Sequence, residues 1–168
     1  MGEGEYKLYE QGNIIKNDFN IGRYYLTRKK FEELKRFEIK KDDILMTCAG
    51  TLGRVALVPE KFEKGLFNSV LMRFRINQEL LRPKYFKLIL ESAGIQNTLV
   101  KDAIGVGIKN MVPTKEITKI KIPIPTLKQQ DKMIKDVEEM DKEIIEHMLK
   151  IMMIRQEKNK KLNSADYD

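Results

Sequence analysis

The stretch from residue 126 to residue 162 contains neither glycine nor proline, and it constrains the fold more than any other feature of this 168-residue chain. Its apolar residues recur at steps of four, three, four, four and three, which is the spacing of one stripe on an amphipathic helix. They are Met133, Val137, Met140, Ile144, Met148 and Ile151. Charged residues are expected to fill the other faces. A helix of roughly 35 residues would extend about 50 Å, too long for a domain of this size to cover, so the stripe is expected to pair with another helix.

The residues before this helix predict a domain of interleaved strands and helices. Four segments have the composition or alternation of strands, and two have helical spacing. The strands are expected at Ile44–Thr47, Arg54–Val58, 67–76 and 117–125, the last as an edge strand because of Pro123. One helix is expected around Phe31, Leu34 and Phe37 with Thr27 as its cap, and another from Pro83 with a break near Gly94. The fold class is therefore α/β, or mixed α+β with a mixed sheet, over residues 1–125; the long helix follows over 126–162, and residues 163–168 form a flexible tail.

Positive charge is concentrated in the predicted domain. Residues 1–125 hold 23 Lys and Arg against 15 Asp and Glu, whereas residues 126–168 hold 9 against 10. A basic domain is expected to meet phosphates, although a generic basic, soluble surface explains the charge equally well.

Several classes of protein are disfavoured by the sequence. No apolar run has the length of a membrane span, and the first residues lack the pattern of a secretory signal. A single cysteine, Cys48, cannot form an intrachain disulfide, so we expect a cytoplasmic protein. Cys48 has no histidine nearby in sequence, and His147 stands alone in the long helix, so neither catalytic nor metal-binding residues are expected.

Three blocks of the sequence resemble the specificity subunits of type I restriction-modification systems. The blocks are DDILMTCAGTLGRVALVPE, IGVGIKNM and IPIPTLKQQDKMI. They are similar, in the same order and spacing, to the family blocks GDILIS-x-x-G-T-x-G-x-x-A-x-V, G-x-x-x-x-N-L and IPIP-P-L-x-E-Q-x-x-I. Asp42 replaces the usual glycine, Thr126 replaces a proline, and Gln129 stands where glutamate is typical.

The resemblance implies a non-enzymatic target recognition domain that binds double-stranded DNA, followed by a helix that pairs antiparallel with a second one. The partners implied are a methyltransferase subunit that uses S-adenosylmethionine and a restriction subunit that uses ATP and Mg²⁺; this chain itself holds no cofactor. The usual family member carries two recognition domains and two helices, so the chain is either a half-length subunit that pairs with itself as a homodimer or a piece of a longer protein. The residues expected in the helix pairing are Leu127, Met133, Ile134, Val137, Met140, Ile144, Met148 and Ile151.

Ten residues are candidates for DNA contact, because cations bind phosphates, aromatic rings stack on bases and amides pair with base edges. They are Tyr24, Tyr25, Arg28, Lys29, Thr51, Arg54, Arg73, Arg75, Lys109 and Asn110. Each has an alternative: the tyrosines can be half-buried, the arginines of residues 73 and 75 can form a solvated strand face, and Asn110 can cap its own turn. Gly50 and Gly53, around Thr51, fit a tight hairpin better than a phosphate loop.

Two alternative functions remain open at this point. A protein-interaction module would use the long helix for docking and the basic surface for an acidic protein partner. A small nuclease or methyltransferase is disfavoured because the sequence has no metal-ligand cluster or cofactor loop.

Overall fold

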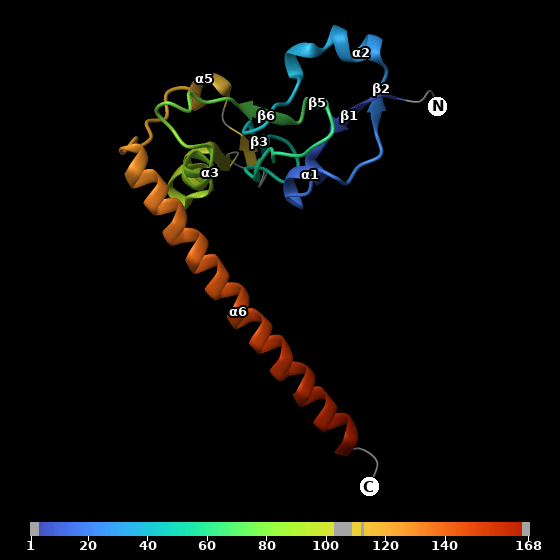
Figure 1. The fold of residues 1–168 in the computed structure, drawn as a ribbon, viewed down its shortest axis with the longest axis vertical. Helices are drawn as coiled ribbons and strands as arrows, with labels where there is room; N and C mark the ends of the chain where they lie inside the picture. Colours follow the sequence, from blue (N-terminus) through green and yellow to red (C-terminus); the bar gives the residue numbers. More distant parts are fainter. Residues whose placement is uncertain (1–3, 103–108, 112, 166–168) are drawn as a thin grey trace. The chain divides into compact units, whose positions relative to one another are not determined.

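The computed structural model describes residues 4–102, 109–111 and 113–165. The chain forms two compact units, Met1–Leu127 and Lys128–Asp168. The first unit contains all the strands and the short helices that the described residues form, and the second consists of one long helix (Figure 1). Among the described residues, no helix combines the length and hydrophobicity that crossing a bilayer requires.

Two three-stranded sheets and a hairpin make up the β structure of the first unit. The first sheet has the order β2-β1-β5, in which β1 pairs antiparallel with β2 and parallel with β5. The second has the order β4-β3-β6 and is antiparallel throughout, while β7 and β8 form the hairpin. The strands are β1 (Tyr6–Tyr9), β2 (Tyr25–Leu26), β3 (Ile44–Thr47), β4 (Val55–Leu57), β5 (Gly65–Phe67), β6 (Leu71–Phe74), β7 (Val100–Asp102) and β8 (Lys109–Met111).

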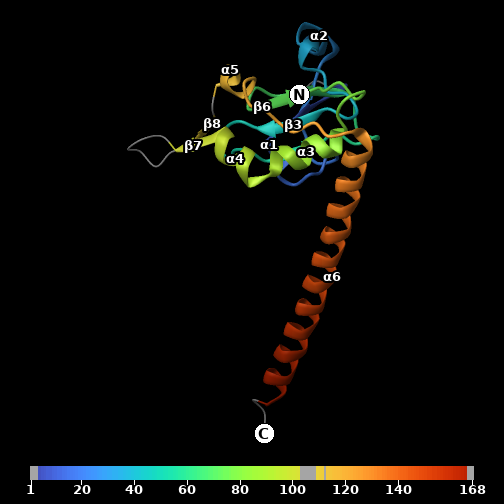
Figure 2. The ribbon, with the colours of Figure 1, turned by 90° about the vertical axis from the view of Figure 1, so that its left-hand side faces the viewer.

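Short helices connect and cover these strands. Helices α1 and α3 both pack on the β4-β3-β6 sheet and lie on the same side of it (Figure 2). The helices of the first unit are α1 (Gln11–Ile15), α2 (Arg28–Glu33), the 3₁₀ turn η1 (Lys35–Phe37), α3 (Pro83–Glu91), α4 (Ala93–Leu99) and α5 (Thr114–Ile117). The architecture is mixed α/β, as the sequence predicts.

Strand β3 is the centre of the domain. All four of its residues are buried, because β4 and β6 flank it in the sheet and helices cover a face. Its first three residues, Ile44, Leu45 and Met46, form an apolar run of the kind typical of a buried strand. The core cluster around it comprises Tyr9, Ile14, Phe19, Ile39, Leu45, Ala56, Val58 and Leu71.

Local signals in the sequence are confirmed where they depend on near neighbours. Strand β3 has the predicted limits, and Pro83 is the first residue of α3. Thr27 caps α2, since its side chain accepts a hydrogen bond from the Lys30 backbone N–H at 3.4 Å. Asp42, where the family has glycine, has a φ of 65°, a left-handed conformation that glycine adopts without strain.

The strand predicted at 117–125 is wrong. Residues 114–117 form α5, and residues 120–126 have no regular structure. Pro123 and Pro125 carry no N–H to donate to a ladder. The alternation instead reflects packing, because Ile120 and Ile122 line an apolar cavity of about 230 Å³ with Phe74, Phe86 and Leu99 among its other walls.

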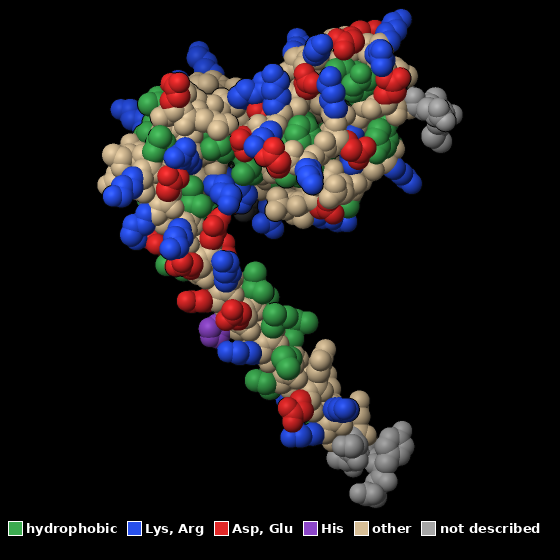
Figure 3. Space-filling view, in the orientation of Figure 1, with side chains coloured by type: hydrophobic (Ala, Val, Ile, Leu, Met, Phe, Trp, Pro, Cys, Tyr) green, Lys and Arg blue, Asp and Glu red, His purple; other side chains and the backbone are tan. Residues whose placement is uncertain are grey.

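The second unit is helix α6, which runs from Leu127 to Ala165. Its 39 residues correspond to about 58 Å of helix at 1.5 Å per residue. It continues three residues into the segment expected to be a tail. Hydrophobic side chains gather along its middle in Figure 3.

The apolar surface of α6 is wider than the single stripe predicted. In the eleven-residue stretch 144–154, only Glu146, His147 and Lys150 are not apolar. The expectation that charged residues fill the other faces is therefore wrong here. The eight apolar side chains are 50–67% exposed, namely Ile144, Ile145, Met148, Leu149, Ile151, Met152, Met153 and Ile154.

Candidate nucleic-acid interface

The segment from β2 into α2 carries four of the candidate residues. Tyr24 and Tyr25 are 51% and 41% exposed, so each ring presents a large part of its surface to solvent. Arg28 pairs with Glu5, the Nη2–Oε2 distance being 3.2 Å, and both side chains are exposed. Lys29 is also exposed. Exposed rings among cations are the combination that stacks on bases and binds phosphates.

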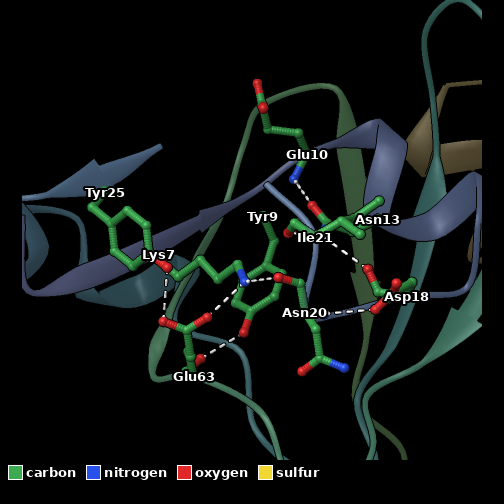
Figure 4. Close-up of polar contacts among 9 residues, drawn as sticks. All are labelled: Lys7, Tyr9, Glu10, Asn13, Asp18, Asn20, Ile21, Tyr25 and Glu63. Carbon is green, nitrogen blue, oxygen red and sulfur yellow. Dashed lines mark hydrogen bonds and ion pairs between the residues drawn. The ribbon is translucent and has the colours of Figure 1, made fainter. Parts of the chain in front are cut away.

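A buried lysine shares a carboxylate partner with Tyr25. Lys7 is completely buried, and its Nζ donates to Glu63 Oε1 at 2.7 Å and to the backbone oxygen of Asn20 at 2.9 Å (Figure 4). The other oxygen of Glu63 accepts a 2.9 Å bond from the Tyr25 hydroxyl. Tyr9 donates to the backbone oxygen of Glu63 at 2.7 Å. This cluster, which we call the Lys7 cluster, joins β1, the segment before β2, β2 itself and the turn before β5.

The Lys7 cluster perturbs the ionisation of its members. The hydrogen bonds from Lys7 and then from Tyr25 lower the pKa of Glu63 below its usual range. The bond to Glu63 raises the pKa of Tyr25, and burial raises the pKa of Tyr9. At neutral pH Glu63 is therefore an anion and both tyrosines keep their hydroxyl protons.

Asn13 fixes the loop that leads from α1 to Tyr24. Its side-chain nitrogen donates to the backbone oxygens of Asp18 at 3.1 Å and Ile21 at 2.8 Å, and its oxygen accepts from the Glu10 N–H at 2.8 Å (Figure 4). Asn13 is buried. The loop is thus held both by the Asn13 side chain and by the Lys7 cluster.

The β3–β4 turn carries Thr51 and Arg54. Gly50 and Gly53 have φ values of 63° and 73°, so the structural role preferred for them from the sequence is confirmed. The buried Thr47 closes the turn: its hydroxyl donates to the Thr51 carbonyl and accepts from the Arg54 N–H. The side chains of Thr51 and Arg54 are left exposed at the surface.

Gly53→Ala is expected to destabilise the domain by about 2–4 kcal/mol. Alanine at a positive φ costs about 1–2 kcal/mol, and a Cβ here would lie 2.2 Å from Gln96 Oε1, in a side chain held by two hydrogen bonds. Urea unfolding followed by circular dichroism measures the change. Gly50→Ala is the matched control, since its φ is similar but its Cβ would meet only the end of Gln11 at 3.1 Å. Equal losses for both variants would contradict the contribution of Gln96.

Arg73 and Arg75 have partners inside the domain. Arg75 makes a two-point contact with buried Asp43, at 2.6 Å for both Nε–Oδ1 and Nη2–Oδ2. Arg73 donates to the backbone oxygen of Glu38 at 2.6 Å, and Arg75 reaches the same oxygen at 3.4 Å, so the two share a face as expected. Asp43 raises the pKa of Arg75, whereas burial and then Arg75 lower that of Arg73. Both guanidinium groups therefore stabilise the fold, whatever else they contact.

Lys109 and Asn110 belong to β8, where Asn110 pairs with Lys101 of β7. Their side chains, and the whole of the glycine-bearing segment before them, lie outside the described residues. The candidate contacts predicted for these two side chains stay predictions.

The described candidates lie in three places: the β2–α2 segment, the β3–β4 turn and the end of β6. Sequence reasoning missed Lys7, Asn13, Glu63 and Gln96, which hold the first two places. The only signal of these residues in the sequence was in β1, where alternation places Lys7 on the same face as Tyr9.

Burial raises the pKa of the Cys48 thiol, which disfavours the reactive thiolate form. Among the described residues no group of three His, Cys, Asp or Glu side chains could hold a metal ion.

Comparison of the sequence with known proteins identifies a matching family. The model of the type I restriction modification DNA specificity domain matches residues 2–151. The type I restriction enzyme EcoBI specificity subunit of Escherichia coli is 26% identical over 149 residues, covering 80% of this chain and 31% of that protein.

Two solved structures share the fold. The HsdS subunit from Thermoanaerobacter tengcongensis has a TM-score of 0.56 at 21% identity, over 64% of this chain and 28% of that one. A chain from a structure on complex assembly and conformational transition of the type I R-M system has a TM-score of 0.60 at 12% identity, over 85% and 32%. The chain thus spans about a third of the length of each of these three proteins.

Proposed function

Because the chain belongs to the family of type I restriction modification DNA specificity domains, we propose that it recognises a short DNA sequence for a type I restriction-modification enzyme. The observation that carries this proposal is the family match itself, which covers residues 2–151 and so spans both units. Residues 1–125 would read the DNA, residues 126–162 would set the distance to a second recognition domain, and residues 163–168 would be a flexible tail.

The DNA-binding surface is proposed to lie on the basic domain. Tyr24, Tyr25, Arg28 and Lys29 form one contact region, and the β3–β4 turn with Thr51 and Arg54 forms another. Cations on the domain would neutralise phosphates, and the exposed tyrosine rings would stack or pack on the sugar and base edges. Lys109, Asn110, Arg73 and Arg75 complete the proposed set.

The long helix is proposed to pair antiparallel with an α6 of a second recognition unit. The pairing would bury the stripe from Met133 to Ile151, with Leu127 and Ile134 at its start. If the second unit is another copy of this chain, a two-fold axis relates two identical domains, and the target is a palindrome interrupted by a fixed spacer.

The apolar side chains of residues 144–154 that lie outside the predicted stripe form an additional face of α6, and this face supports a further helical partner. A two-stranded pairing covers a narrow stripe, whereas residues 144–154 are apolar around most of the helix. A helix of this kind is buried on more than one side. We assign the additional face to the methyltransferase subunit, and the methionines within it suit a surface that adapts to its partner.

The chain is proposed to be non-catalytic within this cytoplasmic assembly. S-adenosylmethionine would be bound by the methyltransferase subunit, and ATP with Mg²⁺ by the restriction subunit. What this chain contributes is the position of both subunits on the DNA.

The affinity for DNA is expected to fall steeply with salt. Each phosphate that a cation neutralises releases counterions, so contact with only two phosphates already lowers the affinity about tenfold between 50 and 200 mM salt. A duplex selected from a random pool, titrated by fluorescence anisotropy with the methyltransferase subunit present, measures the slope. The control repeats the titration with an acidic polypeptide, which carries negative charge as DNA does. An affinity for DNA that does not change with salt would contradict the proposed recognition through phosphate contacts, and tight binding to the polypeptide alone would favour an acidic protein partner.

A further inference from the structure

Arg54 is the candidate arginine that the fold leaves uncommitted. Arg28 pairs with Glu5, Arg75 with Asp43, and Arg73 with the backbone of Glu38. Within the described part of the chain, the Arg54 guanidinium makes no hydrogen bond, ion pair or ring contact, and its side chain is exposed. Its five donors are therefore available to a partner outside the chain.

The backbone that carries Arg54 is nevertheless fixed from several directions. The Thr47 N–H donates to the Arg54 carbonyl at 2.9 Å, and the Arg54 N–H donates to the Thr47 hydroxyl at 3.0 Å. Gln96 of α4 donates to the Gly53 carbonyl at 3.0 Å and to the Leu90 carbonyl at 2.6 Å, which ties the turn to the end of α3. A free guanidinium on a rigid turn is pre-organised for two-point recognition, because little backbone freedom is lost on binding.

The space beside Arg54 is open. Arg54 and Gln96 line a cavity of about 510 Å³, together with Leu52 and Val55 of the same hairpin. The other cation on its wall, Lys87, is bonded to both oxygens of Glu91 at 2.7 and 2.8 Å. Arg54 is thus the cation of this cavity that an acceptor from outside would meet without first breaking an ion pair.

We infer that Arg54 is a specificity-determining residue that binds the O6 and N7 acceptors of a guanine in the target, and that Gln96 is the positioning residue that holds its turn. This inference rests on the proposed DNA recognition and goes beyond it by naming the base that is bound and the residue that positions Arg54. A guanidinium group also binds phosphate in a bidentate way, but a phosphate site needs only the charge, which a flexible lysine supplies as a point charge. Two-point contact with guanine does need one, because both acceptors must be met in one plane.

The experiment compares selected duplexes rather than overall affinity. The full chain with the methyltransferase subunit selects a target from a random pool, and each base pair of that target is then changed in turn. For the wild type, one guanine position is expected to lose about 5- to 150-fold in affinity when changed. Arg54→Lys keeps the charge but removes the fork, so it should abolish discrimination at that position alone and leave the salt slope unchanged.

Gln96 is tested through its dependence on Arg54. Gln96→Met removes both hydrogen bonds at nearly constant volume and should weaken discrimination at the same guanine position. The double variant with Arg54→Lys should lose no more than Arg54→Lys alone, because both act through one contact. Arg36→Lys, the same change of side chain at an exposed arginine outside the proposed contact regions, is the control and should leave that position unaffected.

Three results would overturn the inference. A uniform loss on every duplex with a salt slope smaller by about one would make Arg54 a phosphate contact. Unchanged discrimination in Arg54→Lys would remove it from the interface. Additive losses in the double variant, or loss only in proportion to a lower melting temperature, would make Gln96 structural. Absence of any salt-dependent DNA binding by the wild type would instead refute the proposed function.

Discussion

A chain that carries Met140→Lys together with Ile144→Lys is expected to lose helix pairing while its first unit stays folded. Both side chains belong to the predicted stripe and are 60% and 55% exposed in the single chain, so a partner helix can bury them. Burying each contributes about 1.5–3 kcal/mol, and a symmetric dimer contains four. Their loss therefore weakens the dimer by at least about 10⁴-fold. Sedimentation velocity at micromolar concentration measures the change as a shift from dimer to monomer.

The matched control places the same charges elsewhere on α6. Gln156→Lys with Asn163→Lys also adds two lysines, but these positions lie outside the stripe when 100° is counted per residue. This control should remain a dimer. Near-ultraviolet circular dichroism from the domain's tyrosines should match the wild type in both variants. A stripe variant that sediments as an unchanged dimer would refute the pairing, and a control that dissociates would point to charge alone.

Features that depend on neighbouring residues could be predicted from the sequence. The long helix follows from its period and the absence of breakers, and β3 from a short apolar run between turn signals. Thr27 capped α2 because a cap contacts the backbone three residues on. The role of Gly50 and Gly53 followed from the small number of residues between two predicted strands, since a tight turn requires residues in the left-handed conformation.

Features that depend on topology could not be predicted. Lys7 and Glu63 are 56 residues apart and meet only because β1 pairs parallel with β5. Gln96 reaches Gly53 across 43 residues, and nothing in the local pattern of either residue indicates it. The strand prediction for residues 117–125 was wrong for a related reason. Alternation indicates which side chains are buried, not whether the backbone joins a sheet.

Glu63→Ala is expected to destabilise the first unit strongly, by about 2–4 kcal/mol. The substitution leaves the Lys7 ammonium completely buried with the Asn20 carbonyl as its remaining hydrogen-bond partner. An uncompensated buried charge costs about 3–5 kcal/mol, and the half-exposed position of Glu63 lets water offset part of this. Urea unfolding followed by circular dichroism measures the loss. Lys7→Met should cost less than about 1 kcal/mol, because the charge itself is removed and Glu63 keeps water and Tyr25.

The double variant Lys7→Met with Glu63→Ala decides the cause. If the stranded charge is what destabilises Glu63→Ala, the double variant is more stable than that single variant, which simple additivity forbids. The pH dependence gives an independent check. Lys7 and Tyr25 lower the pKa of Glu63 in the folded state, so its contribution is present above its unfolded pKa of about 4.3 and is lost as pH falls through the lower folded value. Wild type should therefore lose stability on acidification below about pH 4 more steeply than Glu63→Gln does. Parallel acid profiles, or a double variant weaker than Glu63→Ala, would show that the buried Lys7 does not depend on Glu63 for its stability.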